Sequence, residues 1–276
     1  MRRGPAAEWA TAAVVLIGAA LAGCRADTVR ISYRPRTGAH YRYLIDVETT
    51  TETRLGDRPP SSAVHRQRLV VDQTVLGLTA TGTDLRVVLH HGQDAEALRV
   101  RYDRAGHLAA IQREDNLPVS SLGQLGPAEV FPASVDAPPL KALRAGDSWG
   151  IDAPLELAPS AAVVTGVRVT GHGHLVRLST RRGRSVAVIH TVLSVPVEGR
   201  YPIGAESGVV TLRGVETTEA TATRTISDGV VEEESSESRA TFNLSAAPPP
   251  GVTGSPVPGI VAVMVHATTT LMTASG

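Results

Sequence analysis

The sequence is poor in cysteine and aromatic residues and carries no net charge, and these absences argue against several classes of protein. A single cysteine, Cys24, leaves no internal disulfide framework and no zinc site built on several thiolates. Aromatic residues make up 3% of the chain, which disfavours a sugar-binding surface of stacked rings. The formal net charge is zero and no run of basic residues occurs, so nothing in the charge pattern favours a nucleic-acid partner.

Long hydrophobic runs are also missing. The run Ala10–Ala22 is apolar or small except for Thr11, and its length of about 13 residues falls short of the about 20 that a transmembrane helix needs. Arg2 and Arg3 precede this run, and small residues end it. The three parts together are typical of a secretory signal peptide.

Leu21-Ala22-Gly23-Cys24 follows the apolar run and resembles the lipobox of bacterial lipoproteins. The resemblance implies cleavage before Cys24, a diacylglycerol on its sulfur and an acyl chain such as palmitate on the new amine. Two or more chains anchor a protein stably in a membrane. The alternative is an ordinary free thiol behind a normal signal peptide. Arg25, not aspartate, comes next, so retention in the inner membrane of a two-membrane cell is not signalled.

We therefore expect a signal peptide at 1–23 and a single domain at 24–276, held by Cys24 at the extracytoplasmic side of the cell membrane. Within that domain the apolar pattern has a period of two, which indicates strands. Tyr41, Tyr43, Ile45 and Val47, for example, alternate with Arg42, Leu44, Asp46 and Glu48. The expected divisions are a first strand meander at 28–115, a proline-rich connection at 116–147 and a second meander at 148–276.

Three hairpins stand out, at 98–111, at 163–197 and at 209–244 around Asp228-Gly229. In the last of these, Glu232, Glu233, Glu234 and Glu237 predict a solvated face or a guarded sheet edge. Little regular helix is expected beyond short turns at Ser120–Leu125 or Leu140–Leu143. The predicted fold is all-β with minor helix: a large antiparallel curved sheet, as a half-barrel or a sandwich, of about 11 to 12 strands.

Two patterns suggest chemistry, and neither survives inspection. Gly146-Asp147-Ser148-Trp149-Gly150 matches G-x-S-x-G, but a nucleophile elbow needs a helix after the serine, and Pro154 opposes one. We expect Trp149 to begin a strand with its ring buried. His172 and His174 would share one face of a strand, yet no third ligand stands at a supporting spacing. We therefore predict no catalytic residue, no metal site and no cofactor, and a protein that is not an enzyme.

The lipobox, the two meanders and Gly146-Asp147-Ser148-Trp149 after a proline-rich connection resemble uncharacterised lipoproteins of GC-rich, actinobacterial bacteria. More distantly, they resemble the LolA and LppX-like half-barrel carriers, although those carriers have helical lids. Only Arg25, Ala26 and Asp27 separate Cys24 from the first expected strand near Val29, which is about 10–15 Å of extended chain. An acylated Cys24 would hold the domain against the bilayer, and for this reason we expect a membrane-anchored module that binds a lipid or another hydrophobic ligand. The alternative hypothesis is a structural or protein-interaction lipoprotein without a small ligand, which would bind an envelope partner through residues 228–238.

Overall fold

The computed structural model describes residues 28–92, 94–113, 137–154, 168–202, 209–248 and 251–275. Every regular element in these ranges is a β-strand, which confirms the all-β prediction. The eleven strands are β1 (His40–Leu55), β2 (Ser61–Leu78), β3 (Gly82–His91), β4 (Asp94–Asp103), β5 (Leu108–Arg113), β6 (Ser148–Pro154), β7 (Arg168–Arg181), β8 (Arg184–Pro202), β9 (Val209–Thr225), β10 (Val231–Ala246) and β11 (Val257–Ser275).

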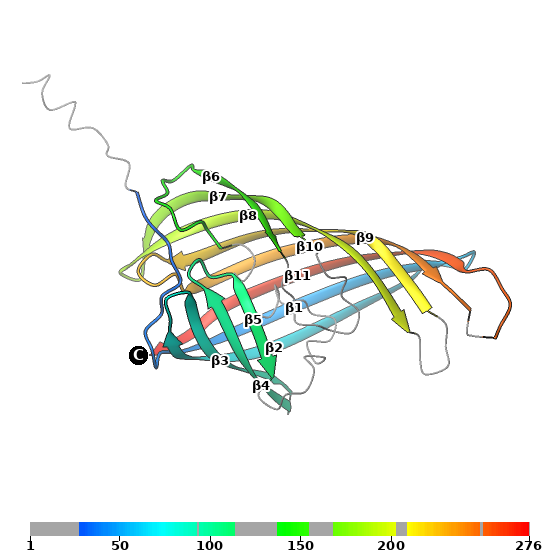
Figure 1. Cartoon of the computed structure of the whole chain (residues 1–276), viewed down its shortest axis with the longest axis horizontal. Helices are drawn as coiled ribbons and strands as arrows, with labels where there is room; N and C mark the ends of the chain where they lie inside the picture. Colours follow the sequence, from blue (N-terminus) through cyan, green and yellow to red (C-terminus); the bar gives the residue numbers. More distant parts are fainter. Residues whose placement is uncertain are drawn as a thin grey trace, which may run out of the picture.

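All eleven strands form one antiparallel sheet, ordered β5-β4-β3-β2-β1-β11-β10-β9-β8-β7-β6 (Figure 1). Neighbours in the sheet are neighbours in the chain except at the centre. There β1 pairs with β11, from His40 opposite Ser275 to Leu55 opposite Gly259. The two meanders expected from the sequence are therefore halves of a single curved sheet, and the open sheet rather than the sandwich is the architecture found.

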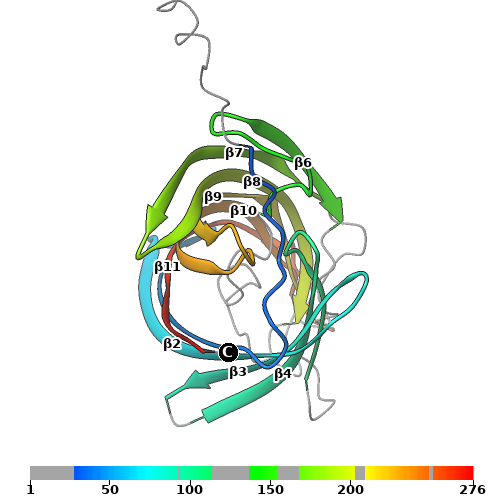
Figure 2. The same ribbon diagram turned by 90° about the vertical axis from the view of Figure 1, so that its left-hand side faces the viewer.

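The sheet curves into an open arch when it is viewed along its strands (Figure 2). Its edge strands are β5 and β6, which are consecutive among the described strands but stand at opposite ends of the strand order. Because all ten neighbouring pairs are antiparallel and the number of strands is odd, β5 and β6 run in the same direction. An antiparallel ladder, the pairing used everywhere else in the sheet, therefore cannot join these two edges.

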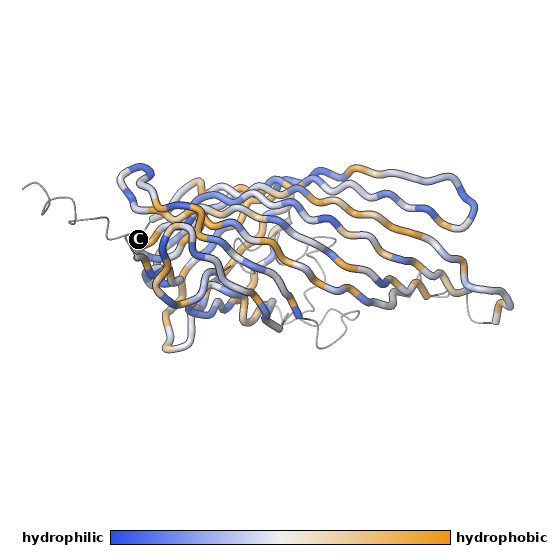
Figure 3. Tube along the Cα trace, turned by 90° about the horizontal axis from the view of Figure 1, so that it is seen from above, coloured by the Kyte–Doolittle hydropathy of each residue, from blue (hydrophilic) through white to orange (hydrophobic). Residues whose placement is uncertain are grey.

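The alternation seen in the sequence separates a concave face from a convex face. In β1, Tyr41, Tyr43 and Ile45 are buried, while Arg42 is exposed and Asp46 is half-exposed. Figure 3 shows the same alternation of hydrophobic and hydrophilic positions along the strands. The buried set lies on the concave side, which keeps the convex side for polar residues.

A segment without regular structure, residues 28–39, crosses the concave side at one end of the sheet; we call it the strap (Figure 2). Val29 forms two backbone hydrogen bonds of 2.8 Å with Leu143, which precedes β6, and the N–H of Tyr33 donates to the carbonyl of Arg104, at the β4–β5 turn. Ile31 belongs to the apolar cluster around β6–β8, and Tyr33 to the cluster around β1–β4. The strap thus ties the two halves of the arch together.

Trp149 confirms the expectation of a buried ring at the start of a strand, since it is the second residue of β6 and is 8% exposed. The opposite residue on β7 is Gly173, and a Cβ there would lie 2.3 Å from the indole ring. Gly171, two positions away, would place a Cβ 2.1 Å from the carbonyl oxygen of Val192. The absence of side chains at Gly171 and Gly173 lets neighbouring groups approach β7 closely. The pairing of β7 with β8 shifts register later, between Leu175 and Arg177.

The prediction for the acidic hairpin was wrong for the sheet edge and for two of the four glutamates. β10 is not an edge, because it lies between β9 and β11. Glu232 and Glu234 are each 8% exposed, whereas Glu233 faces outward and pairs with Arg181. Glu232 is also paired, with Arg184 at 2.7 Å between side-chain nitrogen and oxygen, which offsets part of the cost of burying its charge.

Residues 140–143 contain no helical turn, contrary to the expectation for Leu140–Leu143; Leu143 forms only the isolated bridge to Val29. The turn expected at Ser120–Leu125 lies outside the described residues. So does most of the proline-rich connection 116–147, of which 137–147 are described.

Replacing Gly173 with alanine should destabilise the protein by about 1–3 kcal/mol, because the added methyl group displaces the indole of Trp149. Trp149 is the only tryptophan after residue 23, so its emission should shift to longer wavelength in the same variant. Thermal unfolding and fluorescence would measure both effects. Gly150→Ala is the matched control, since a Cβ at Gly150 meets no atom within 4 Å. Equal stability of the two variants would contradict this account of Gly173.

Candidate functional site

The concave face divides into two halves along the strands, and the half beside the strap is filled. Four of the five tyrosines gather there, Tyr33, Tyr41, Tyr43 and Tyr102, each no more than 9% exposed. The rings of Tyr33 and Tyr102 lie 5.1 Å apart between centroids. Burial raises the pKa of Tyr33, Tyr43 and Tyr102, and that of Tyr41 to about 12, so all four hydroxyls stay protonated at neutral pH.

Arg224 is buried in the wall of the same cluster, with 1% of its surface exposed. Its guanidinium lowers the pKa of the neighbouring tyrosines Tyr33 and Tyr102, against the larger effect of burial. The void lined by these groups and by Gln73 has a volume of only about 10 Å³. A space of that size holds at most one water molecule, so we assign this half of the face to the stability of the fold.

The other half of the concave face, which we call the distal inner face, is partly exposed. The register of the ladders places Thr51 (β1), Val263 (β11), Ala240 (β10), Glu216 (β9) and Val195 (β8) in one row across five strands. Of these five, only Ala240 is buried, and the other four are half-buried. The row therefore presents an apolar surface, interrupted by one carboxyl, that remains accessible.

The next row toward the strand ends has the same character. It contains Thr53, Val261, Phe242, Gly214 and Val197. Phe242 lies over Gly214, where a Cβ would come within 2.7 Å of the ring. Two adjacent rows thus combine β-branched and aromatic side chains with hydroxyl groups and no charge other than Glu216.

Glu216 is the unusual residue of the distal inner face. Burial raises the pKa of its carboxyl, while hydrogen bonds from Ser238 and Thr218 act in the opposite direction. The hydroxyls of Ser238 and Thr218 are also 2.7 Å apart, so the three side chains form one polar group. The inner positions that flank Glu216 on β8 and β10, Val195 and Ala240, carry no charge.

Sequence reasoning missed Glu216, although a signal was present. Ala220 and Ala222 are buried, and Glu216 shares their parity along β9. A glutamate at an inward position of a half-buried strand is unusual, since a charged side chain is seldom buried without a partner. The threonines on both sides of the strand concealed the alternation that would have revealed it.

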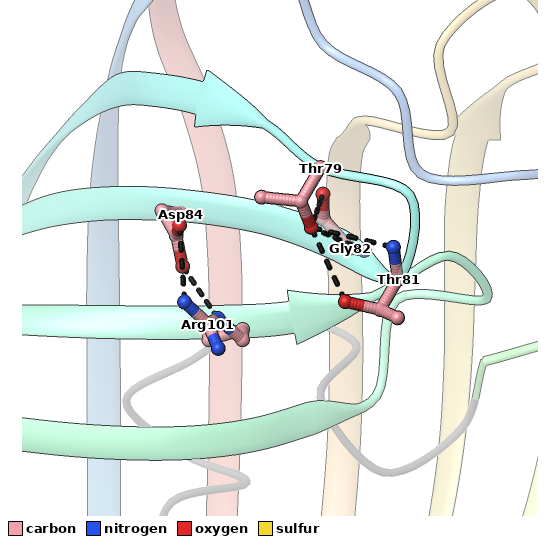
Figure 4. Close-up of polar contacts among 5 residues, drawn as sticks. All are labelled: Thr79, Thr81, Gly82, Asp84 and Arg101. Atoms are coloured by element: carbon pink, nitrogen blue, oxygen red, sulfur yellow. Dashed lines mark hydrogen bonds and ion pairs between the residues drawn. The ribbon is translucent and has the colours of Figure 1, made fainter.

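The convex face carries ion pairs between neighbouring strands. Arg42 and Asp72, Arg66 and Glu48, Arg68 and Asp46, Arg101 and Asp84, Arg168 and Asp152, and Arg213 and Glu198 are such pairs. Figure 4 shows the Asp84–Arg101 pair, with separations of 2.6 and 3.2 Å, near the turn that Thr79 closes by accepting from the N–H groups of Thr81 and Gly82. Each exposed pair contributes little stability, but together the pairs make the convex face hydrophilic.

Ser148 begins β6 and lies on this exposed face, where its Oγ is 3.1 Å from Nδ1 of His174. β6 continues to Pro154 as a strand, so the geometry of a nucleophile elbow does not form. His172 and His174 share a face, as expected from their spacing. Among the described residues no three histidine, cysteine or acidic side chains are grouped to hold a metal ion.

A hollow of about 440 Å³ lies beside the edge strand β5 and is lined in part by Leu76, Asp84, Arg101 and Ile111. Asp84 and Arg101 already pair with each other there. Because the Asp84–Arg101 pair already occupies part of this lining, we take the distal inner face as the candidate for binding.

Two sequence predictions of binding sites have different outcomes. Cys24, the predicted lipidation site, lies outside the described residues. The Asp228-Gly229 turn is described and is packed under the strap, because the N–H of Arg34 donates to the carbonyl of Asp228 and a Cβ on Gly229 would lie 2.6 Å from the carbonyl oxygen of Ser32. This end of the proposed partner-binding stretch 228–238 is therefore covered.

No family model and no curated protein matches the sequence. Among solved structures, a loop-deletion mutant of OmpT, an outer membrane protein of Vibrio cholerae, is similar at 10% identity, with 83% of this chain and 99% of that chain covered and a TM-score of 0.23. An outer membrane channel from Pseudomonas putida F1 is also similar at 10% identity, over 86% and 97% of the two chains, with a TM-score of 0.19. At such low scores the likeness establishes neither a shared fold nor a function.

The part of the chain that the structure describes contains no helix long and apolar enough to cross a membrane.

The raised pKa of Glu216 predicts a pH dependence of stability. Because the folded protein binds this proton more tightly than the unfolded chain, the free energy of unfolding should fall as the pH rises from about the ordinary value of 4.5 through the raised pKa. Glu216→Gln should remove this fall and be more stable than the parent above the raised pKa. Denaturant unfolding between pH 4 and pH 8 would measure the difference.

Glu219→Gln provides the control on the convex face of the same strand, where Glu219 interacts with His190 at 2.8 Å. This variant should show no such gain in stability at neutral pH. If Glu216→Gln were instead less stable than the parent at pH 8, the carboxylate would be contributing favourable interactions that the burial argument does not include.

Proposed function

We propose that this chain is a membrane-anchored extracytoplasmic lipoprotein whose distal inner face binds an apolar ligand. The observation that carries the proposal is the accessible row Thr51–Val263–Ala240–Glu216–Val195 on the concave side of a sheet whose convex side carries ion pairs. Apolar side chains left partly exposed on a concave surface are the usual lining of small-molecule sites.

The chemistry of the row limits the class of ligand. Val263, Val195 and the neighbouring Phe242 offer apolar contact, while Glu216 with Ser238 and Thr218 offers a single polar position. A ligand with an apolar body and one hydrogen-bond donor or cationic group would complement this arrangement, whereas a carboxylate or phosphate next to Glu216 would be repelled.

The anchor at Cys24 rests on the lipobox Leu21-Ala22-Gly23-Cys24 and is part of the same proposal. A binding role, and not catalysis, fits the described residues, where the G-x-S-x-G serine begins a strand. The alternative of a protein-interaction lipoprotein stays a prediction. Its proposed surface is reduced, because Val231, Glu232 and Glu234 are buried and the Asp228-Gly229 turn lies under the strap.

Ligand binding can be tested with two substitutions at adjacent positions of β11. Val263→Lys places a charge in the middle of the row, and Ala262→Lys places the same charge on the convex face, where Ala262 pairs with Glu52 and Thr241. The probe is N-phenyl-1-naphthylamine, an apolar molecule with one N–H donor. We expect the parent and Ala262→Lys to bind it and Val263→Lys to lose roughly tenfold in affinity, since the bound probe would cover the lysine charge and remove it from water.

Thermal unfolding of both variants separates lost binding from lost folding. Equal binding by the two variants would place the ligand elsewhere. A parent protein that binds no probe, and that releases no molecule on solvent extraction followed by native mass spectrometry, would contradict the proposal.

Lipidation makes a separate prediction. In the producing bacterium, Cys24→Ala should abolish metabolic labelling with a palmitate analogue and release the protein from the membrane fraction. The intact mass of the mature protein should place its N-terminus at residue 24 with the added acyl groups. A mature protein that begins at another residue, with an unmodified thiol at Cys24, would support the alternative of an ordinary signal peptide.

A further inference from the structure

The strap and the turns around it form one end of the molecule, which we call the tether end. It comprises residues 28–39, 103–107, 140–147, 181–184 and 226–233. Backbone hydrogen bonds hold these segments together, for example from Tyr33 to Arg104, from Arg34 to Asp228 and from Val29 to Leu143. The position of these segments at one end of the sheet can be followed in Figure 1.

Positive charge accumulates at the tether end. Its segments contain nine basic and five acidic side chains, a net charge of +4 in a chain whose formal net charge is zero. The strap alone contributes Arg30, Arg34 and Arg36 and no acidic residue, and all three arginines are exposed. The β1–β2 hairpin at the opposite end is neutral over 52–58, with two basic and two acidic residues.

The acidic groups of the tether end are occupied by local partners. Asp103 accepts hydrogen bonds from the N–H groups of Gly106 and His107, Asp147 accepts from the N–H of Arg144, and Asp228 accepts from Thr225 and Val230. Glu232 and Glu233 pair with Arg184 and Arg181. The remaining basic side chains form no ion pair within the described part of the chain: Arg30, Arg34, Arg36, Arg104, Lys141, Arg144 and Arg182.

The covalent chain also leads to this end. The first described residue, Thr28, is four positions after Cys24. Four residues span on the order of 13–14 Å even when fully extended. An anchor at Cys24 would therefore hold the tether end, and not the opposite end, within reach of the bilayer.

We propose that the tether end is a docking surface for anionic lipid headgroups, which orients the sheet with the strap toward the membrane and the distal inner face away from it. The charge complements that of anionic lipids, which attract basic residues close to their surface. The orientation rests on the anchor at Cys24, whereas the electrostatic contact is a property of the described residues alone. Neither depends on the ligand proposed above.

The contact can be measured without the anchor. The chain from residue 24 onward, with Cys24→Ser, should bind vesicles of phosphatidylcholine with phosphatidylglycerol at low ionic strength, but not vesicles of phosphatidylcholine alone. Added salt should release it, because exposed charges are screened over about 10 Å at 0.1 M.

Two triple variants, each of which removes three positive charges, show which end of the protein contacts the vesicles. Arg30→Gln, Arg36→Gln and Arg144→Gln remove three charges from the tether end. Arg54→Gln, Arg58→Gln and Arg213→Gln remove three from the opposite end. We expect the first to weaken binding to anionic vesicles by roughly tenfold or more and the second to leave it within about twofold, given the strength of attraction per basic residue near a charged membrane. Circular dichroism would confirm that both variants are folded.

Orientation is tested with the acylated protein in vesicles that contain a lipid-bound energy acceptor. A fluorophore on Lys141→Cys should transfer energy efficiently, and one on Asp57→Cys, at the far end of β1, should not, because the 16 residues of β1 extend about 50 Å. Equal weakening by the two triple variants, binding to neutral vesicles, or equal transfer from the two fluorophores would each overturn the proposal. Loss of probe binding by the distal inner face would leave these results unchanged, so the two proposals fail separately.

Discussion

The ladder between β1 and β11 is the interaction on which the rest of the structure depends. It joins residues 40–55 to residues 259–275, and without it the chain would be two separate meanders with four exposed edges. The row of five side chains across the distal inner face crosses this ladder, so it exists only when the pairing is complete. The ladder joins residues more than two hundred positions apart, and long-range pairing of this kind slows folding.

Once the ladder has formed, the period of two along each strand determines what each face can do. One-residue shifts of register would move Glu216 to the convex side and Glu219 to the concave side. The irregularities between Arg42 and Tyr43 and between Val231 and Glu233 lie in the half beside the strap, so the rows of the distal inner face remain regular. The candidate site is thus built where the sheet is most uniform.

Much of the fold could be predicted from local pattern, because the alternation of apolar and polar residues and the turn residues between strands can be recognised from neighbouring positions. The hairpins around Gly106, Gly183 and Gly229 were found in this way, and each of these glycines has a positive φ. The pairing of β1 with β11, the burial of Glu232 and Glu234 and the role of Glu216 could not be predicted. They depend on which strands meet across the sheet, and a single sequence does not contain that information locally.

The odd number of strands has a mechanical consequence. With no ladder between β5 and β6, the gap between the edges is spanned among the described residues only by the strap, which joins Leu143 on one side to Arg104 and Val75 on the other. The arch is therefore tied across its edges at the strap end and open at the other end. Widening of the far end would require bending of the central strands and no change in the hydrogen bonds between them.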